Sequence, residues 1–288
     1  MRPSTFSIVA LDREAGELGI AVASKFLSVG ALVPWLEAGA GAIATQAWAN
    51  TGFGSLGLAS LREGRSATGA LERLLATDDG REHRQVGIVD AAGQSASHTG
   101  TACIPWAGGI AGDAFAAQGN CLAGPGVLDA LAATFSASRA RLADRLIAAL
   151  AAAQAAGGDK RGQQSAALLV VKPKGGYGGY TDRYVDLRVD DAREPIEELA
   201  RLLKLHALYF FPAEPHDVLA IDAALGAELV ALLQRAGALP PAEKHFDEAA
   251  HEALVRFMHV ENLEERVRAD GTIDRQTLEY LREWKAPG

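Results

Sequence analysis

Short apolar runs separated by turn residues fill most of the first two thirds of the chain. Runs of aliphatic and β-branched residues of this length, bounded by Gly, Asp and Asn, predict β-strands joined in hairpins. The predicted strands are Phe6–Leu11, Leu18–Ser24, Val29–Leu36, Gly41–Gln46, Gln85–Asp90, Gln94–Thr99, Ser165–Lys172 and Tyr184–Val189.

Other segments show the helical spacing of apolar residues, with an apolar residue every three or four positions. The predicted helices are 55–77, Pro125–Ala137, Ser138–Ala155 and Pro195–Leu208, followed in the tail by Leu225–Gln234, Asp247–His259 and Asp274–Trp284. Hairpin strands segregated from helices are typical of antiparallel sheets covered by helices. We therefore expect an α+β fold, a four-layer αββα sandwich over residues 1–210. The proline-containing segment Phe211–Pro215 leads to a small all-α domain at 211–288.

Charge is unevenly distributed between these two parts. The chain carries a net charge of −8, and residues 212–288 hold 8 Lys and Arg against 15 Asp and Glu. No basic stripe is available for a phosphate backbone, so a nucleic-acid partner is not expected. The apolar runs are too short to cross a membrane, and the N-terminus has no apolar signal segment. A cytoplasmic protein is the default expectation.

The sequence shows no pattern for a cofactor or a metal. Cys103 and Cys121 form no disulfide framework and lack metal-ligand spacing. The glycines near Gly39 and Gly108 lack the strand and helix context of a dinucleotide-binding loop. We therefore predict no cofactor and no metal.

Thr5 opens the first predicted strand and is a candidate nucleophile. If the four residues before it were removed, its free amine would lie beside its own hydroxyl. An α-amine has a pKa of about 7.7–8.0, so part of it is neutral at pH 7 and can accept the hydroxyl proton. The simpler interpretation is that a β-branched residue starts a strand. Ser7 lies on the same strand face and is the alternative nucleophile.

Polar residues cluster at the strand ends and loops that follow. Amide side chains and backbone N–H groups are what an oxyanion hole requires, and charged groups can orient an amine or bind a carboxylate. Each residue also has a structural interpretation, as a loop cap, a solvated strand end or a turn residue. The candidate catalytic residues besides Thr5 and Ser7 are Lys25, Gln46, Asn120 and Asp159, and the candidate substrate-binding residues are Asn50, His98, Arg161, Gln164 and Ser165.

The segment from Thr5 through Lys25 resembles the opening hairpin of the N-terminal-nucleophile (Ntn) hydrolases, which include proteasome subunits. Residues 4–205 as a whole resemble a bacterial Ntn-hydrolase-like family of unknown function. The tail is similar to a peptidoglycan-binding-like domain, through Glu261–Arg266 and Ile273-Asp274. The motifs that carry the family resemblance are Ala44–Asn50, Ile104–Gly108, Gln118–Asn120, Ala123–Pro125, Gly158–Gly162, Gln164–Val171 and Asp182–Asp190.

The chain departs from the pattern that these resemblances imply. The position that matches the proteasome aspartate is about Ala23, and no lysine lies near Ala38-Gly39, so the proteasome charge network is absent. Members of the closer family often begin Met-Thr, whereas here Met-Arg-Pro-Ser precedes Thr5. A free Thr5 amine therefore requires the loss of four residues.

Two functions remain open at this stage. The first is an amidohydrolase that cleaves a small amide or peptide bond, with Thr5 as nucleophile and Gln46 and Asn120 as oxyanion donors. The second is a catalytically inactive Ntn-fold binding or scaffold protein whose helical tail docks a partner. The missing signal segment and the acidic tail argue against peptidoglycan binding. The largely apolar segment Leu142–Ala156 predicts a homo-oligomer.

Overall fold

The computed structural model describes residues 5–285. It divides into two compact units, Met1–Leu203 and Lys204–Gly288, and the helix α5 (Pro195–Phe210) runs through the boundary. The predicted antiparallel sheets with packed helices, and the predicted helical C-terminal segment, are confirmed.

The larger sheet of the first unit has six strands in the order β10-β9-β2-β1-β8-β7. All neighbouring strands pair antiparallel, and the central hairpin places Thr5 opposite Ser24. Strands β1 and β2 are buried over nearly their whole length, as expected for the middle of a covered sheet. The strands are β1 (Thr5–Asp12), β2 (Glu17–Ser24), β7 (Gly108–Gly112), β8 (Phe115–Gly119), β9 (Ser165–Val171) and β10 (Arg183–Val189).

The smaller sheet has four strands in the order β3-β4-β5-β6, again antiparallel throughout. Its strands are β3 (Pro34–Glu37), β4 (Gly41–Ala47), β5 (Arg84–Asp90) and β6 (Ser95–Thr99). The two sheets contact each other face to face, mainly through β1, β2 and β8 against β4 and β5. Aliphatic side chains such as Val9, Ile20 and Val89 fill the space between them.

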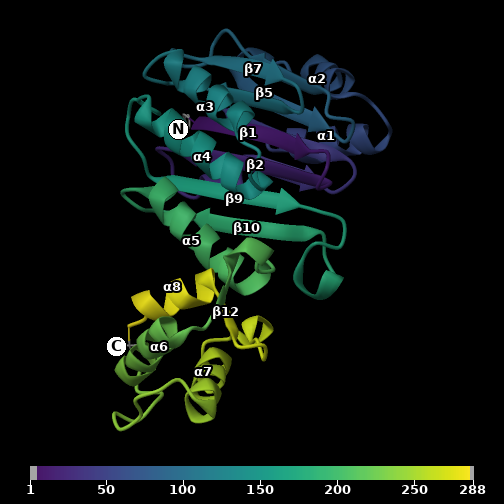
Figure 1. The fold of residues 1–288 in the computed structure, drawn as a ribbon. Helices are drawn as coiled ribbons and strands as arrows, with labels where there is room; N and C mark the ends of the chain where they lie inside the picture. Colours follow the sequence, from purple (N-terminus) through teal and green to yellow (C-terminus); the bar gives the residue numbers. More distant parts are fainter. Residues whose placement is uncertain (1–4, 286–288) are drawn as a thin grey trace. The chain divides into compact units, whose positions relative to one another are not determined.

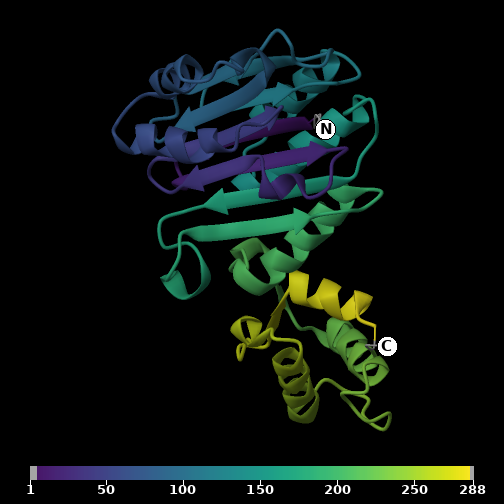
Figure 2. The same ribbon diagram turned by 180° about the vertical axis from the view of Figure 1, so that it is seen from behind.

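Each sheet carries helices on its outer face. The helices α1 (Gly52–Arg62) and α2 (Ala67–Ala76) pack on the smaller sheet, and α3 (Gly126–Ala137) and α4 (Leu142–Ala155) pack on the larger one. In Figure 1 α3 and α4 lie across the larger sheet, and Figure 2 shows the same unit from behind. The leucines of α4 are buried within the chain, so the apolar character of this helix is explained without a second copy.

Several predicted elements differ from the structure. The predicted strand Val29–Leu36 is a short 3-10 turn at Val29–Ala31 followed by β3. The predicted helix 55–77 is divided between α1 and α2, because Gly64 takes a left-handed φ of 82° between them. Strands β7 and β8 were not predicted, since their glycines and alanines have low intrinsic strand propensity.

The second unit contains three helices and a small sheet within its described residues. The helices are α6 (Ala223–Arg235), α7 (Glu248–Val260) and α8 (Arg275–Glu283), which are labelled in Figure 1. Strands β11 (Val218–Ala220) and β12 (Thr272–Asp274) pair antiparallel, which corrects the expectation of an all-α domain. The predicted boundary at residue 210/211 lies inside this unit, seven residues after Leu203.

A buried arginine connects the end of α5 to the start of α8 within the second unit. The Arg266 guanidinium donates to the carbonyl oxygens of Ala207, Leu208 and Phe211, at 2.6–2.7 Å. It also pairs with Asp274 at 2.7 Å, and both side chains are at least 95% buried. Asp274 in turn accepts the Thr277 N–H and caps α8. This one side chain thus satisfies the free carbonyls at the C-terminus of α5.

The substitution Arg266→Met should destabilise the second unit by about 3–5 kcal/mol, because it leaves the buried Asp274 carboxylate without its counter-charge and removes a hydrogen-bond donor from three carbonyls. The matched control is Arg282→Met, which breaks an ion pair with Glu228 whose side chains are 47% and 38% exposed. That loss should be at most about 1 kcal/mol. Urea unfolding followed by the fluorescence of Trp284, which packs against Phe257, measures both. Equal losses in the two variants would contradict the expectation.

Candidate functional site

A network of amide side chains fills one end of the space between the two sheets. Gln46, Gln85 and Gln118 lie near the ends of β4, β5 and β8, at positions that point inward by strand alternation. All three are fully buried, and so are Thr5 and Ser7 on β1. Buried polar groups of this kind must be hydrogen-bonded to be tolerated.

Gln85 is the centre of this network. Its Nε2 donates to Thr99 Oγ1 at 2.9 Å, to the Gly108 carbonyl at 3.1 Å and to the Gly119 carbonyl at 2.8 Å. Its Oε1 accepts from Gln46 Nε2 at 2.8 Å and from Asn120 Nδ2 at 2.9 Å. Since its nitrogen faces only acceptors and its oxygen only donors, the orientation of the Gln85 amide is determined.

Gln46 uses both of its amide hydrogens inside the network. Besides Gln85, its Nε2 approaches the carbonyl oxygens of Thr5 at 3.1 Å and of Gln118 at 3.3 Å. No hydrogen remains for a substrate oxygen unless one of these bonds breaks. The structure therefore brings Gln46 to Thr5 and makes it a support for the Thr5 backbone.

Ser7 is held between two amides. Its Oγ donates to Gln46 Oε1 at 2.6 Å and accepts from Gln118 Nε2 at 2.6 Å. Gln118 lies against Gly87, where a Cβ would come within 1.9 Å of its Oε1. A serine nucleophile needs a neighbouring base to take its proton, and neither amide can do so.

Thr5 lies beside this network at the start of the central strand. Its Oγ1 donates to Ser24 Oγ at 3.2 Å, and its carbonyl accepts the Asn120 backbone N–H at 3.0 Å. Asn120 also donates from Nδ2 to Gln85, so it joins Thr5 to the amide network. The predicted residues Thr5, Ser7, Gln46 and Asn120 are therefore brought together.

Asp159 lies near the same end of the larger sheet. Its buried carboxylate accepts the backbone N–H groups of Lys25 at 3.2 Å and of Arg161 at 2.9 Å. It also pairs with the Arg161 guanidinium at 2.7 Å, and this hydrogen bond raises the pKa of Arg161. Lys25 itself is exposed, and its Nζ donates to the Gln163 carbonyl at 3.1 Å. Asp159 thus ties the end of β2 to the loop that precedes β9.

The other predicted binding residues have structural contacts. Ser165 Oγ accepts the Val29 N–H at 3.0 Å and donates to the Phe26 carbonyl. Gln164 Nε2 donates to Asp191 at 3.0 Å on the surface. His98 Nε2 lies 3.0 Å from the Arg81 carbonyl. These contacts anchor loops, and His98 and Gln164 have no contact with the amide network among the interactions of the described residues.

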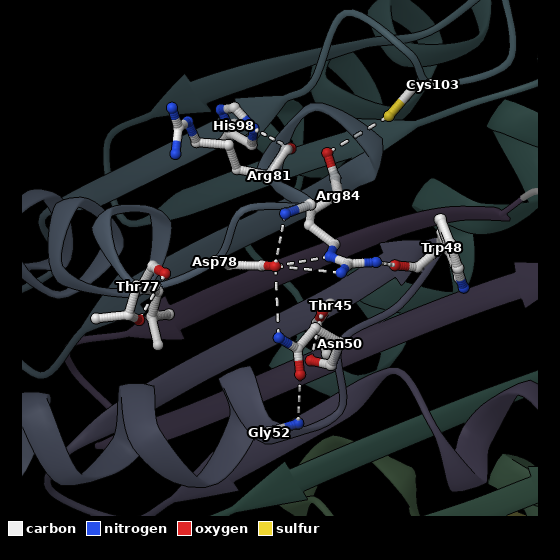
Figure 3. Close-up of polar contacts among 12 residues, drawn as sticks. Thr45, Trp48, Asn50, Gly52, Thr77, Asp78, Arg81, Arg84, His98 and Cys103 are labelled. Carbon is white, nitrogen blue, oxygen red and sulfur yellow. Dashed lines mark hydrogen bonds and ion pairs between the residues drawn. The ribbon is translucent and has the colours of Figure 1, made fainter.

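Asn50 belongs to a second polar cluster, drawn in Figure 3. Its Oδ1 accepts the Gly52 N–H at 3.1 Å at the start of α1, and its Nδ2 reaches Asp78 at 3.4 Å. Asp78 forms a bidentate pair with Arg84 at 2.7 and 3.2 Å. Arg84 also donates to the Trp48 carbonyl at 2.7 Å, so the cluster holds the loop after β4 in place.

A small cavity lies between these two polar clusters. Its volume is about 10 Å³, room for one water-sized group. The lining residues are Ala47, Trp48, His83, Ala102, Cys103, Ile104 and Asn120. Asn120 is 1% exposed, and neither its Oδ1 nor His83 Nδ1 has a hydrogen-bond partner. Burial also raises the pKa of the Cys103 thiol.

Residues 5–199 match a family described as "Family of unknown function (DUF1028)". The chain belongs to the DUF1028 family. A crystal structure of the DUF1028-family protein SPO2555 from Silicibacter pomeroyi is similar, with 34% identity and a TM-score of 0.66 over 72% of this chain and 88% of that one. Residues 209–281 match the "Putative peptidoglycan binding domain" family. No match was found among curated proteins.

Within residues 5–285, no group of three or more His, Cys, Asp and Glu side chains is arranged to hold a metal ion. Over the same described part of the chain, no helix combines the length and the apolar character needed to cross a membrane.

Sequence reasoning missed Gln85 and Gln118 as members of the site in this DUF1028 protein. Both occupy strand positions whose inward neighbours are apolar or glycine; Gly87 and Val89, for example, lie two and four residues after Gln85. A glutamine on the apolar face of a predicted strand is the signal that would have identified them. It was hidden because glutamine is also common at strand ends, where water satisfies the amide.

Replacing Gln85 with Leu should destabilise this DUF1028 protein by about 3 kcal/mol or more. The change removes the five hydrogen bonds of the Gln85 amide and leaves Asn120 Nδ2 buried without a partner. A lost hydrogen bond costs about 0.5–1.5 kcal/mol, and an unmet buried donor costs about 1–3 kcal/mol. The control is Gln94→Leu, at an exposed position on the neighbouring strand connection, which should change stability by less than about 0.5 kcal/mol. Urea denaturation of both variants tests this. A Gln85→Leu protein as stable as the control would show that the network is unimportant.

Acid should loosen the loop that carries Trp48. The hydrogen bond from Arg84 is the main reason that the pKa of Asp78 falls from 3.8 to about 2. A carboxylate whose pKa is lowered on folding stabilises the protein above its unfolded pKa, and this contribution is lost as pH falls from about 4 towards 2. After allowance for solvent screening the loss is about 1–2 kcal/mol.

The measurement is the unfolding free energy between pH 5 and pH 2 for the wild type and Asp78→Asn. The Asp78→Asn protein should be less stable at pH 5 and should lose less stability on acidification. Parallel curves for the two proteins would rule out Asp78 as the titrating group.

Proposed function

We propose that this protein is an amide hydrolase that uses Thr5 as an N-terminal nucleophile once the four preceding residues are removed. The observation that carries the proposal is the position of Thr5. It begins the strand β1, next to the centre of the larger sheet, and its hydroxyl and carbonyl are held by Ser24, Gln46 and Asn120. A nucleophile needs such support to keep its oxygen in place.

The layer arrangement also supports an Ntn-hydrolase relation. Two antiparallel sheets pack face to face with a helix pair outside each, and the candidate nucleophile starts a central strand. This is the αββα layout expected for the Ntn hydrolases. A fold relation by itself argues for a site and not for an activity, so the chemistry rests on Thr5.

The proposed reaction needs only groups of this chain and water. The free amine of Thr5 takes the proton of Oγ1, and Oγ1 attacks the carbonyl carbon of the substrate. The C–N bond then breaks, and the leaving nitrogen takes the proton from the amine. Water hydrolyses the acyl-threonine ester in the second half of the reaction and restores the hydroxyl.

The second candidate function is a binding or scaffold protein without catalysis. The observation that favours it is the state of the amides near Thr5, because Gln46 has no spare hydrogen and the Thr5 side chain is fully buried. In that case the amide network serves only to hold the two sheets in register.

A chain shortened by Arg2–Ser4, so that it begins Met1-Thr5, separates the two functions. Cellular removal of Met1 before a small residue would expose the Thr5 amine, and intact mass shows whether this has happened. The processed protein should hydrolyse at least one member of a panel of primary and substituted amides. The full-length protein and the shortened Thr5→Ala variant should be at least about 100-fold slower.

The control for this experiment is the shortened Thr5→Ser variant. It keeps both the amine and a hydroxyl, so it should retain measurable turnover. Activity in the Thr5→Ala variant, or none in a processed protein of confirmed mass, would end the proposal and favour the scaffold function.

A further inference from the structure

We propose that the cavity lined by Trp48, His83, Cys103 and Asn120 receives the nitrogen end of a primary amide, so that the substrates are primary amides and the released product is ammonia. This inference rests on the proposed function, since it assigns the leaving-group side of the same site. Five features of the structure support it, namely the size of the cavity, its hydrogen-bond acceptors, its connection to Thr5 through Asn120, its apolar lining residues and the contacts that hold the lining residues in place.

The size of the cavity limits what can enter. About 10 Å³ accommodates one heavy atom with its hydrogens. An NH₂ group fits this volume, while an N-alkyl or N-aryl group requires its walls to move. Three of the lining residues, Ala47, Ala102 and Ile104, have apolar side chains, which cannot form hydrogen bonds with a larger substituent.

The acceptors in the cavity wall match a group with N–H donors. The Gln85 amide has a determined orientation, and Asn120 must turn its Nδ2 towards Gln85 Oε1. Its Oδ1 is therefore an acceptor, fully buried and without a partner. His83 Nδ1 is also buried without a partner and accepts a hydrogen in the tautomer protonated at Nε2. An unmet buried acceptor destabilises the protein, and a bound NH₂ group would supply the missing donors.

A residue that lines the cavity also contacts the backbone of the proposed nucleophile. Asn120, whose side chain lines it, donates its backbone N–H to the Thr5 carbonyl at 3.0 Å. Ala47, another lining residue, directly follows Gln46, which donates to the same carbonyl. A primary amide attacked by Thr5 Oγ1 can thus direct its nitrogen into the cavity while its acyl group stays outside.

Arg84 holds two of the lining residues, Trp48 and Cys103, in place. Its guanidinium donates to the Trp48 carbonyl at 2.7 Å and lies 5.3 Å from the centre of the Trp48 ring. Its backbone carbonyl accepts from Cys103 Sγ at 3.4 Å. Figure 3 shows the hydrogen bonds of Trp48 and Cys103 with Arg84. The rings of Trp48 and His83 also pack in a T-shaped arrangement, with centroids 5.3 Å apart. A movement of Trp48 would therefore break contacts with both Arg84 and His83.

The first experiment compares leaving groups at constant acyl group. On the processed protein, each primary amide of the panel is paired with its N-methyl and anilide analogues. The primary amide should have a kcat/KM at least about tenfold higher than the N-methyl analogue. The Cys103→Ala variant enlarges the cavity and should reduce this ratio to below about threefold. The matched control is Cys121→Ala, at the other buried cysteine, which does not line the cavity and should leave the ratio unchanged.

A second experiment uses the full-length protein and needs no turnover. Methyl methanethiosulfonate modifies Cys103 and Cys121, and mass spectrometry follows the rate at each cysteine. Acetamide should slow the modification of Cys103 at least about threefold and leave that of Cys121 unchanged. N-Methylacetamide at the same concentration should not slow either.

The two experiments distinguish failure of this inference from failure of the proposed function. Protection of Cys103 by acetamide without any hydrolysis would keep the subsite and reject the hydrolase. Thr5-dependent hydrolysis that prefers N-methyl amides or anilides would keep the hydrolase and overturn the subsite. Equal protection by acetamide and N-methylacetamide, or none by either, would also overturn it.

Discussion

The hydrogen-bond requirements of one buried amide, that of Gln85, govern the arrangement of the first unit. The side chain is fully buried between two sheets, and its contacts reach β4 and β6 of the smaller sheet and β7 and β8 of the larger one. An apolar contact between sheets tolerates sliding, whereas a set of directional bonds does not. The amide network therefore determines the register of one sheet over the other, and with it the position of Thr5.

This constraint explains why the site is both rigid and closed. Strand β1 supplies Thr5 and Ser7. The Gln46 amide of β4 contacts both residues, and the Gln118 amide of β8 also contacts Ser7. The apolar side chains of the inter-sheet core continue directly from these polar ones, as the neighbouring position Val9 shows. Preorganisation of this kind suits a site whose groups must not move during a reaction. The same network leaves only Asn120 Oδ1 and Gln118 Oε1 with unused acceptor capacity among its described side chains.

Hairpins and amphipathic helices of this protein could be predicted from the sequence because local pattern determines them. The hairpin β1–β2 and the helices α6 to α8 lie within a few residues of their expected bounds. Strands β7 and β8 could not be predicted in this way. The β7 sequence, Gly-Gly-Ile-Ala-Gly, becomes a strand only through its contacts with β6 and β8. Thr5, Ser7, Gln46 and Asn120 were anticipated from residue type and strand position. Gln85 was not, because its importance lies in partners that are distant in the sequence.

The contacts of Arg266 have a consequence for where the C-terminal unit can be separated from the rest. The proline-rich segment at 211–215 looks like a linker, yet three of the four acceptors of this guanidinium are carbonyls of residues 207–211. A fragment that begins at residue 211 would lack the carbonyls of Ala207 and Leu208. The Arg266 guanidinium would then lose two of its four hydrogen-bond acceptors. The unit that can be transferred between proteins therefore includes the last turn of α5. A gene fusion would preserve the fold of this unit only if the junction lay before that turn.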